Sequence, residues 1–153
     1  MLEKLIIFLR RLEDSLLVLI LCTMLGVAVY QILARNLFGG GLNWGDALVR
    51  VAVFWVAMVG AMVASRNDEH IRIDVIARFL TPEIKRWVSR VTFLFTALMC
   101  LAFTWYSAHF VWLEYQDGVM AFSGVPAWSC EIVMPVSFLV IGMRYLLHGF
   151  SPA

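Results

Sequence analysis

The chain has 153 residues, of which 62% are hydrophobic and 15% are charged, and its formal net charge is +1. This balance excludes an ordinary soluble globular domain, and the charge gives no indication of a nucleic-acid partner. Four apolar segments, each able to supply the roughly 20 residues that a membrane-crossing helix needs, predict an all-α integral membrane protein. We expect a single membrane domain over residues 1–153, with transmembrane helices at about 15–37, 46–65, 82–113 and 126–147.

The first apolar segment has the basic start of a signal peptide, at Lys4, Arg10 and Arg11. Its apolar core is longer than that of a signal peptide, and no A-x-A cleavage pattern follows it. We therefore interpret this segment as a retained transmembrane helix.

The first loop, "ARNLFGGGLNWGDALVR", has Arg35 at the end of the first helix and Trp44 just before the second. Asp46 and Arg50 are four residues apart, so they can meet on one helix face. The three glycines permit a tight return that can bring Arg35 close as well. Two interpretations stay open, namely a local ion-pair cluster that fixes this hairpin and a contact with a partner.

The connection from Ser65 to Arg86 is strongly charged. From Ile73 onward, apolar residues recur at positions i, i+3, i+4 and i+7, which is typical of an amphipathic helix. Because basic residues flank it, we predict a short arm helix over about 70–80 that lies on the cytoplasmic membrane surface. Thr81 and Pro82 then indicate the start of the third transmembrane helix.

The distribution of Lys and Arg predicts the orientation of the chain. Ten of these residues fall on the side of the termini and the Ser65–Arg86 connection, and two fall on the other side. The positive-inside rule therefore predicts cytoplasmic N- and C-termini. No Lys or Arg occurs between Val91 and Met143, whereas Glu114 and Asp117 do. This acidic outer face is either a simple consequence of orientation or a docking surface.

The fourth apolar segment contains Pro135, which is expected to kink its helix, and Arg144 near its end. Arg144 has no acidic residue within reach along the sequence. We therefore expect Arg144→Ala to reduce the amount of folded protein less than Arg50→Ala does.

The histidines do not support a cofactor. Haem between two histidines needs ligands at one membrane depth, but His109 is near the outer end of its helix and His148 near the inner end of the next. Their separation is on the order of 30 Å. The segments also contain no H-E-x-x-H, G-x-S-x-G or phosphate-loop motif, so neither an enzyme nor a bound cofactor is expected. A membrane anchor for a redox enzyme is the alternative function.

Three segments together resemble the small (DctQ-type) membrane subunit of tripartite ATP-independent periplasmic (TRAP) transporters. They are "RNLF…LNWGDALVR", "VGAMVASRNDEHIRID" and "GVPAW…P…MRY", and the resemblance covers essentially the whole chain. The second segment, with Glu69, His70 and Asp74 after Arg66, is the most specific. The family commonly has W-x-E-E in the first loop, whereas this chain has Asp46 followed by Ala47.

The resemblance implies a non-catalytic scaffold, or stator, of a sodium-driven transporter for an organic acid in the bacterial inner membrane. It implies a 1:1 complex with a large elevator-type membrane subunit, a periplasmic substrate-binding protein as second partner, and contact with membrane lipids. We expect a structural or interface role for one group of residues: Arg35, Trp44, Asp46, Arg50, Arg66, Glu69, His70 and Asp74. Glu114 and Asp117 are candidates for docking of the binding protein.

Overall fold

The computed structural model describes residues 2–67 and 82–150. Four helical stretches within them are long and apolar enough to cross a membrane, which confirms the predicted four-helix membrane fold. These stretches are Ile7–Phe38, Gly45–Arg66, Trp87–Asp117 and Ala127–Leu147. The arm helix predicted over residues 70–80 lies outside the described residues.

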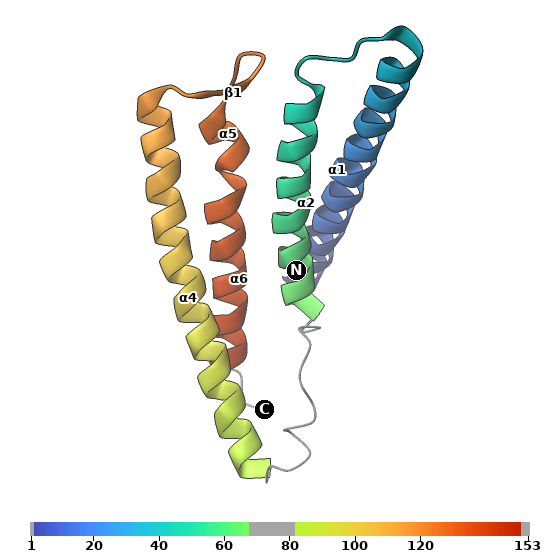
Figure 1. The fold of residues 1–153 in the computed structure, drawn as a ribbon. Coiled ribbons are helices and arrows are strands. Elements are labelled where there is room, and N and C mark those ends of the chain that lie inside the picture. The colour runs from blue at the N-terminus through green and yellow to red at the C-terminus, as the bar shows by residue number, and fades with distance from the viewer. Residues whose placement is uncertain (1, 68–81, 151–153) are drawn as a thin grey trace.

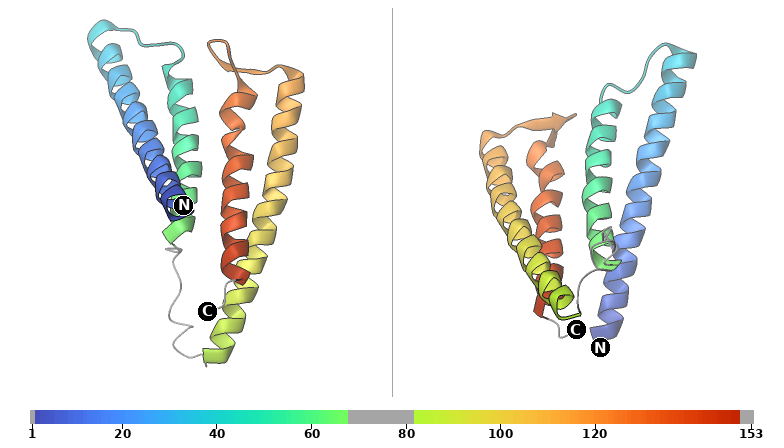
Figure 2. Two further views of the ribbon diagram at one scale, coloured as in Figure 1. Left: turned by 180° about the vertical axis from the view of Figure 1, so that it is seen from behind. Right: turned by 60° about the horizontal axis from the view of Figure 1, so that its bottom comes forward.

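The four long helices, labelled as in Figure 1, stand side by side in one row in the order α1, α2, α6, α4. Both views in Figure 2 keep this order. The α1–α2 and α4–α5 connections lie at the same end of the helices, which we call the loop end. Their bounds are α1 Leu2–Phe38, α2 Gly45–Asn67, α4 Pro82–Asp117 and α6 Val133–Phe150. The described helices therefore form essentially one layer with α1 and α4 at its two edges, although Glu13 of α1 also reaches Arg144 of α6.

Helix α1 begins at Leu2, well before residue 15, where the apolar run starts. Charged residues such as Arg10 and Glu13 precede the apolar run but still belong to the helix, because both residue types favour helical structure. The helix stops after Phe38, where Gly39 has a φ of 67°. This left-handed conformation suits glycine and is a common helix terminator.

A small β-hairpin joins α4 to the short helix α5 (Ala127–Glu131). Strand β1 (Met120–Phe122) pairs with β2 (Val125–Pro126), and the turn between them has positive φ at both Ser123 and Gly124. Two positive φ values are characteristic of the tightest hairpin turns, which match the twist of paired strands.

A break at Ile132 separates α5 from α6. Pro135 explains this break, because proline cannot donate the backbone hydrogen bond to Glu131 and its ring crowds that carbonyl group. The predicted kink is thus an interruption three residues before the proline. The carbonyl of Cys130, beside the break, accepts a 2.7 Å hydrogen bond from the indole of Trp55 on α2.

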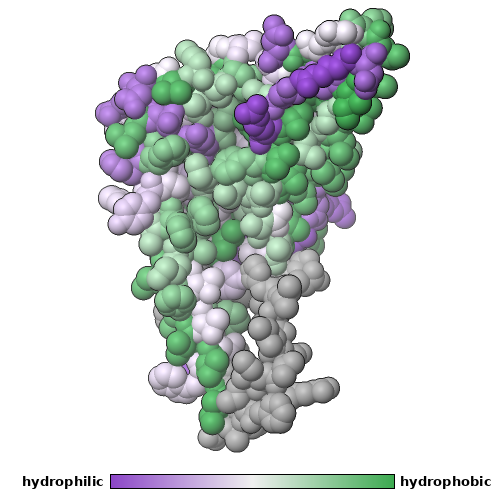
Figure 3. All heavy atoms as spheres, in the orientation of Figure 1, coloured by the Kyte–Doolittle hydropathy of each residue, from purple (hydrophilic) through white to green (hydrophobic). Residues whose placement is uncertain are grey.

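The apolar packing is concentrated between α4 and α6. Ala97, Ile141 and Tyr145 are buried together there, and the rings of Phe103 and Phe138 stack with their centroids 5.3 Å apart. Most large apolar side chains on the described helices are instead exposed. Figure 3 shows hydrophobic residues along the sides of the helices and hydrophilic residues gathered toward the loop end. A layer with so little core must be covered by lipid or by another protein.

The close approach of α6 to α4 predicts a stability effect at Gly142. A Cβ atom at Gly142 would lie 3.2 Å from the Cβ of Cys100, whereas one at Gly26 would have nothing within 4 Å. We expect Gly142→Leu to lower the free energy of unfolding by about 1–3 kcal/mol through overpacking. Gly26→Leu is the matched control and should be neutral or slightly stabilising, because leucine favours helix. Thermal unfolding of the detergent-solubilised protein measures both, and equal melting temperatures would contradict this packing.

Candidate functional site

Two polar clusters join the helices. One lies at the loop end, and the other lies at the opposite ends of the helices. At the loop end, the amide of Gln31 binds the first loop from both sides. Its Oε1 accepts from the backbone N–H of Leu42 at 2.8 Å, and its Nε2 donates to the carbonyl of the same residue at 3.0 Å. Nε2 also lies 3.2 Å from Oδ1 of Asp46. Gln31 is only 4% exposed. The first loop and Asp46 satisfy both polar atoms of its amide.

The loop backbone approaches this amide closely at two glycines. A Cβ atom at Gly45 would lie 2.5 Å from Nε2 of Gln31, and one at Gly41 would lie 2.6 Å from Oε1. Both distances are too short for real contacts. The glycines of the loop therefore serve a close approach to Gln31 as well as a tight return.

The structure pairs Asp46 with Arg35 of α1. Both side chains are about half exposed. Arg50 is exposed. It influences Asp46 through its charge, and no hydrogen bond or ion pair between the two is found among the described residues. Asp46 lies in the first turn of α2, where a negative charge also favours the helix dipole. Trp44 precedes that turn, and its carbonyl accepts the backbone N–H of Leu48 at 3.0 Å. These contacts make a local clamp of the first hairpin.

The second cluster lies at the opposite end and comprises residues from three helices: Glu13, Asp14, Ser65, Arg66 and Arg144. Here the Arg144 guanidinium of α6 donates to Glu13 of α1 and to the carbonyl of Met62 on α2. It also lies 3.2 Å from Oγ of Ser65, which is 1% exposed. One side chain of α6 therefore ties together α1 and α2. We call this set the Arg144 cluster.

Arg66 completes the cluster. Its Nη2 donates to Oδ1 of Asp14 at 2.9 Å, and its Nη1 lies 3.7 Å from Oε2 of Glu13. Its Nη1 also donates to the backbone carbonyl of Arg10 at 3.2 Å. Two carboxylates thus face two guanidinium groups, so the cluster is electrically balanced. Both arginines lie near the C-terminal end of α2, where the helix dipole favours positive charge.

The depth of Arg144 explains why it needs these partners. It lies seven residues from the midpoint of the apolar stretch Ala127–Leu147, which is about 10 Å along a helix. That position is inside the roughly 15 Å half-thickness of the hydrocarbon. Ionisable side chains at such depths pair with one another or with backbone carbonyls, as Arg144 does. No acid is within reach of Arg144 along the sequence, but Glu13 of another helix supplies one, so the expectation that Arg144→Ala is milder than Arg50→Ala loses its basis.

The acidic outer residues are arranged differently from one another. Asp117, the last residue of α4, is exposed, whereas Glu114 is half-buried close to Glu131 of α5. One carboxylate oxygen of each glutamate is buried without a hydrogen-bond partner among the described residues. Of the two predicted docking residues, Asp117 is the more exposed.

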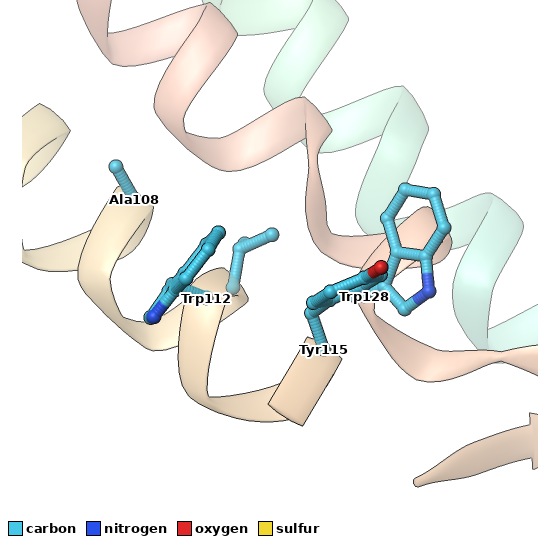
Figure 4. Close-up of a pocket in the computed structure, with 5 residues that line it drawn as sticks. Ala108, Trp112, Tyr115 and Trp128 are labelled. Carbon is cyan, nitrogen blue, oxygen red and sulfur yellow. The ribbon is translucent and has the colours of Figure 1, made fainter. Parts of the chain in front are cut away.

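An open pocket of about 240 Å³ lies beside these acids, between α4 and α5. Figure 4 shows Tyr115 extending from α4 toward Trp128, and their rings meet edge to face at 5.7 Å. Trp112 is the third aromatic wall, with its ring centroid 6.0 Å from that of Tyr115. This aromatic group lies at the loop end, where an aromatic belt is expected at the membrane boundary.

Glu69, His70 and Asp74 lie outside the described residues. Within residues 2–67 and 82–150, no group of three or more His, Cys, Asp or Glu side chains could hold a metal ion. His109 is exposed on α4. Because Phe103 of α4 lies beside Phe138 of the antiparallel α6, His109 is level with about residue 132 of α6. His148 lies about 16 residues beyond that level, which is roughly 24 Å at the helical rise. These positions do not favour a shared haem.

Antiparallel helices of membrane length, held by ion pairs at membrane depth, define a small multi-pass membrane protein. The model of the family "Tripartite ATP-independent periplasmic transporters, DctQ component" matches residues 24–152. The chain therefore belongs to the DctQ component family of TRAP transporters, and it is a small permease subunit of the inner membrane.

Its relatives agree with this assignment. The chain is 27% identical over 142 residues to the ectoine TRAP transporter small permease protein TeaB of Halomonas elongata, which covers 92% of this chain and 74% of that protein. It is 21% identical over 109 residues to the C4-dicarboxylate TRAP transporter small permease protein DctQ of Pseudomonas aeruginosa, covering 68% of this chain and 51% of the relative. These relatives are transporter components, which is consistent with a protein that is not an enzyme.

A third relative indicates the partner. The chain is 24% identical over 142 residues to the sialic acid TRAP transporter permease protein SiaT of Haemophilus influenzae, and the match covers 91% of this chain but 22% of SiaT. The counterpart of this chain is thus a minor part of a longer permease polypeptide. This supports a second membrane subunit of a TRAP transporter as the partner of the present chain.

The balance of charge in the Arg144 cluster predicts the outcome of a double substitution. Arg144→Leu alone leaves Glu13 without its closest cation and should cost about 3 kcal/mol, as removing one partner of a buried pair does. Glu13→Leu combined with Arg144→Leu removes one charge of each sign and should be less damaging than either single change. Arg50→Leu, at an exposed position, should change stability by no more than about 0.5 kcal/mol. Melting temperatures of the unaltered protein, the two single variants, the double variant and Arg50→Leu test this, and additive losses in the double variant would contradict the pairing.

The contact between Gly45 and Gln31 predicts a second coupling. Gly45→Ala should lower the free energy of unfolding by about 1–3 kcal/mol, because its Cβ would collide with the Gln31 amide. The same change in a Gln31→Ala background should cost clearly less, since the obstacle is gone. Gly40→Ala is the control, because a Cβ atom there would have nothing within 4 Å. If Gly45→Ala costs the same with and without Gln31, the clamp does not hold the loop.

Proposed function

We propose that this chain is the non-catalytic stator of a sodium-driven, binding-protein-dependent transporter for an organic acid. It pairs 1:1 with the large permease subunit, which carries the substrate and sodium sites and performs the elevator movement. The observation that carries the proposal is the Arg144 cluster. Its ionisable groups at membrane depth are engaged in contacts between helices, which suits a rigid brace better than a moving pathway.

The substrate class is inferred from the relatives. Two of the three are named for an acid, sialic acid or a C4-dicarboxylate, and all three are named as TRAP transporter permeases. Sodium coupling and the elevator movement follow from the family resemblance. Specificity is then a property of the binding protein and the large subunit.

In the proposed orientation the Arg144 cluster lies toward the cytoplasm and the loop end toward the periplasm. The excess of Lys and Arg near the termini and the Ser65–Arg86 connection supports this orientation. The motif with Glu69, His70 and Asp74 then belongs to a cytoplasmic arm that braces the complex. His70→Ala or Asp74→Ala should lower assembly or uptake and leave the order of substrate preference unchanged.

The principal test is affinity purification of the chain from its native membranes in mild detergent, followed by mass spectrometry. The expected result is a stoichiometric and much larger membrane protein with the sequence of a TRAP large permease. Recovery of a redox enzyme would instead support the anchor function. Recovery of the chain alone under conditions that keep it folded would overturn the proposal.

Docking of the binding protein at the loop end can be tested by charge reversal. Asp117→Lys should weaken binding-protein-dependent uptake most at low salt, because exposed charges steer association and are screened by ions. Asp117 is preferred to Glu114 for this test, since Glu114 is half-buried and its reversal would also disturb the fold. Glu3→Lys is the control for net charge, because it makes the same charge change at the N-terminal end of α1, away from the loop end. Unchanged uptake and unchanged salt dependence in Asp117→Lys would exclude this docking surface.

A further inference from the structure

One face of α4 carries polar aromatic side chains where the membrane is most apolar. Trp105 is 75% exposed and Tyr106 is 70% exposed, and His109, one turn further on, is exposed as well. Their spacing places them on one side of the helix. Ala97 and Ser107 are buried on the opposite side, which faces α6. The three residues therefore point out of the edge of the row, and we call them the α4 edge face.

Two independent measures place this face near the membrane midplane. Trp105 and Tyr106 lie three and four residues from the midpoint of the apolar stretch Trp87–Asp117, or about 6 Å at most. Phe103 of α4 stacks on Phe138 of α6, which is one residue from the midpoint of Ala127–Leu147. By either measure His109 is within about 10 Å of the midplane, which is still inside the hydrocarbon.

Several other polar side chains at membrane depth are satisfied within the chain, although the buried hydroxyl of Ser137 has no hydrogen-bond partner among the described residues. Thr23, Thr92 and Thr104 donate to carbonyl groups four residues earlier on their own helices. The indole of Trp55 reaches the carbonyl of Cys130. By contrast, the indole N–H, the phenol and the imidazole of the α4 edge face have no hydrogen-bond partner among the described residues.

An aromatic belt does not account for the α4 edge face. Belts place Trp and Tyr at the membrane–water boundaries, where their polar groups reach water. That position fits other exposed aromatic residues with polar groups near the ends of the helices: Trp44, Trp87, Trp112 and Tyr115. Trp105 and Tyr106 lie too deep for their donors to reach water, and lipid chains offer no acceptor.

We infer that a transmembrane helix of the large permease subunit packs against the α4 edge face and supplies hydrogen-bond acceptors to it. This inference rests on the proposed function and specifies the surface through which the complex forms. Trp and Tyr are the residues most enriched at the energetic centres of protein interfaces. In the sialic acid relative, the counterpart of this chain is part of one longer permease polypeptide. This supports a membrane-embedded partner for the present chain. The other edge of the row, formed by α1, then faces lipid.

Site-specific photocrosslinking in native membranes tests the surface directly. A photoreactive phenylalanine analogue is introduced at Trp105, and at Val29 as the control, since Val29 is 54% exposed on α1 at the opposite edge. The complete transporter is expressed in each case. The expected result is a crosslink to the large subunit from position 105 that is at least tenfold stronger than that from position 29. A crosslink to lipid alone, a crosslink to a second copy of this chain, or equal yields from both positions would overturn the inference.

Substitutions give a second measurement that does not depend on crosslinking. The triple variant Trp105→Leu, Tyr106→Phe, His109→Leu should reduce co-purified large subunit at least tenfold. Tyr30→Phe removes a tyrosine hydroxyl from an exposed position on α1, at the opposite edge of the row, and should change recovery less than twofold. Because these side chains are exposed, the variants are expected to fold, and the amount of monodisperse chain verifies this.

The outcomes separate the inference from the proposed function. If the unaltered chain recovers no large membrane protein, the proposed function fails and the inference fails with it. If the unaltered chain recovers the large subunit and the triple variant does so within twofold, the α4 edge face is not the interface. The stator function would then stand with a different contact surface.

Discussion

Hydrocarbon does not tolerate an unpaired charge, and the ion pair between Arg144 and Glu13 is how this chain meets that constraint. Arg144 lies about 10 Å from the midpoint of its apolar stretch, which is inside the hydrocarbon. Its partners come from α1 and α2, so the pair can form only when the three helices stand in the observed order. The interaction therefore specifies the fold as much as it stabilises it, a role that buried ionic groups play in some other proteins.

Each neighbouring pair of helices in the row is joined by a different kind of contact. Gln31 fastens the loop end of α1 to α2, while the Arg144 cluster fastens the other end to α6. The indole of Trp55 links α2 to the carbonyl exposed by the break before α6. Only α4 and α6 rely mainly on apolar packing, around Ala97 and Gly142. A thin layer has little interior, so directional polar contacts replace the core that a globular protein would have.

The sequence was sufficient for the number of helices because apolar length is a local property. It was less informative about helix ends, since α1 continues through charged residues that mark the membrane boundary. The partner of Arg144 could not be predicted, because Glu13 is 131 residues away along the chain and becomes a neighbour only through the spatial order of the helices. A usable signal existed nevertheless, in that an arginine within an apolar segment requires an acid somewhere. Gln31 gave no such signal, because a neutral amide at the end of a helix has no characteristic spacing. The i, i+4 pattern of Asp46 and Arg50 was real but secondary, since Arg35 on the facing helix reaches the carboxylate.

The polar groups at membrane depth thus divide into two kinds. Those of the Arg144 cluster and the indole of Trp55 bond inward and make the layer rigid. The donors of the α4 edge face point outward and remain available after the chain has used its own acceptors. A brace needs both properties, because it must hold its own shape and also grip a partner in a medium where apolar contact alone gives little preference for protein over lipid. The clustering of three polar aromatic side chains on α4 therefore distinguishes that edge of the row, even though both edges are apolar along most of their length.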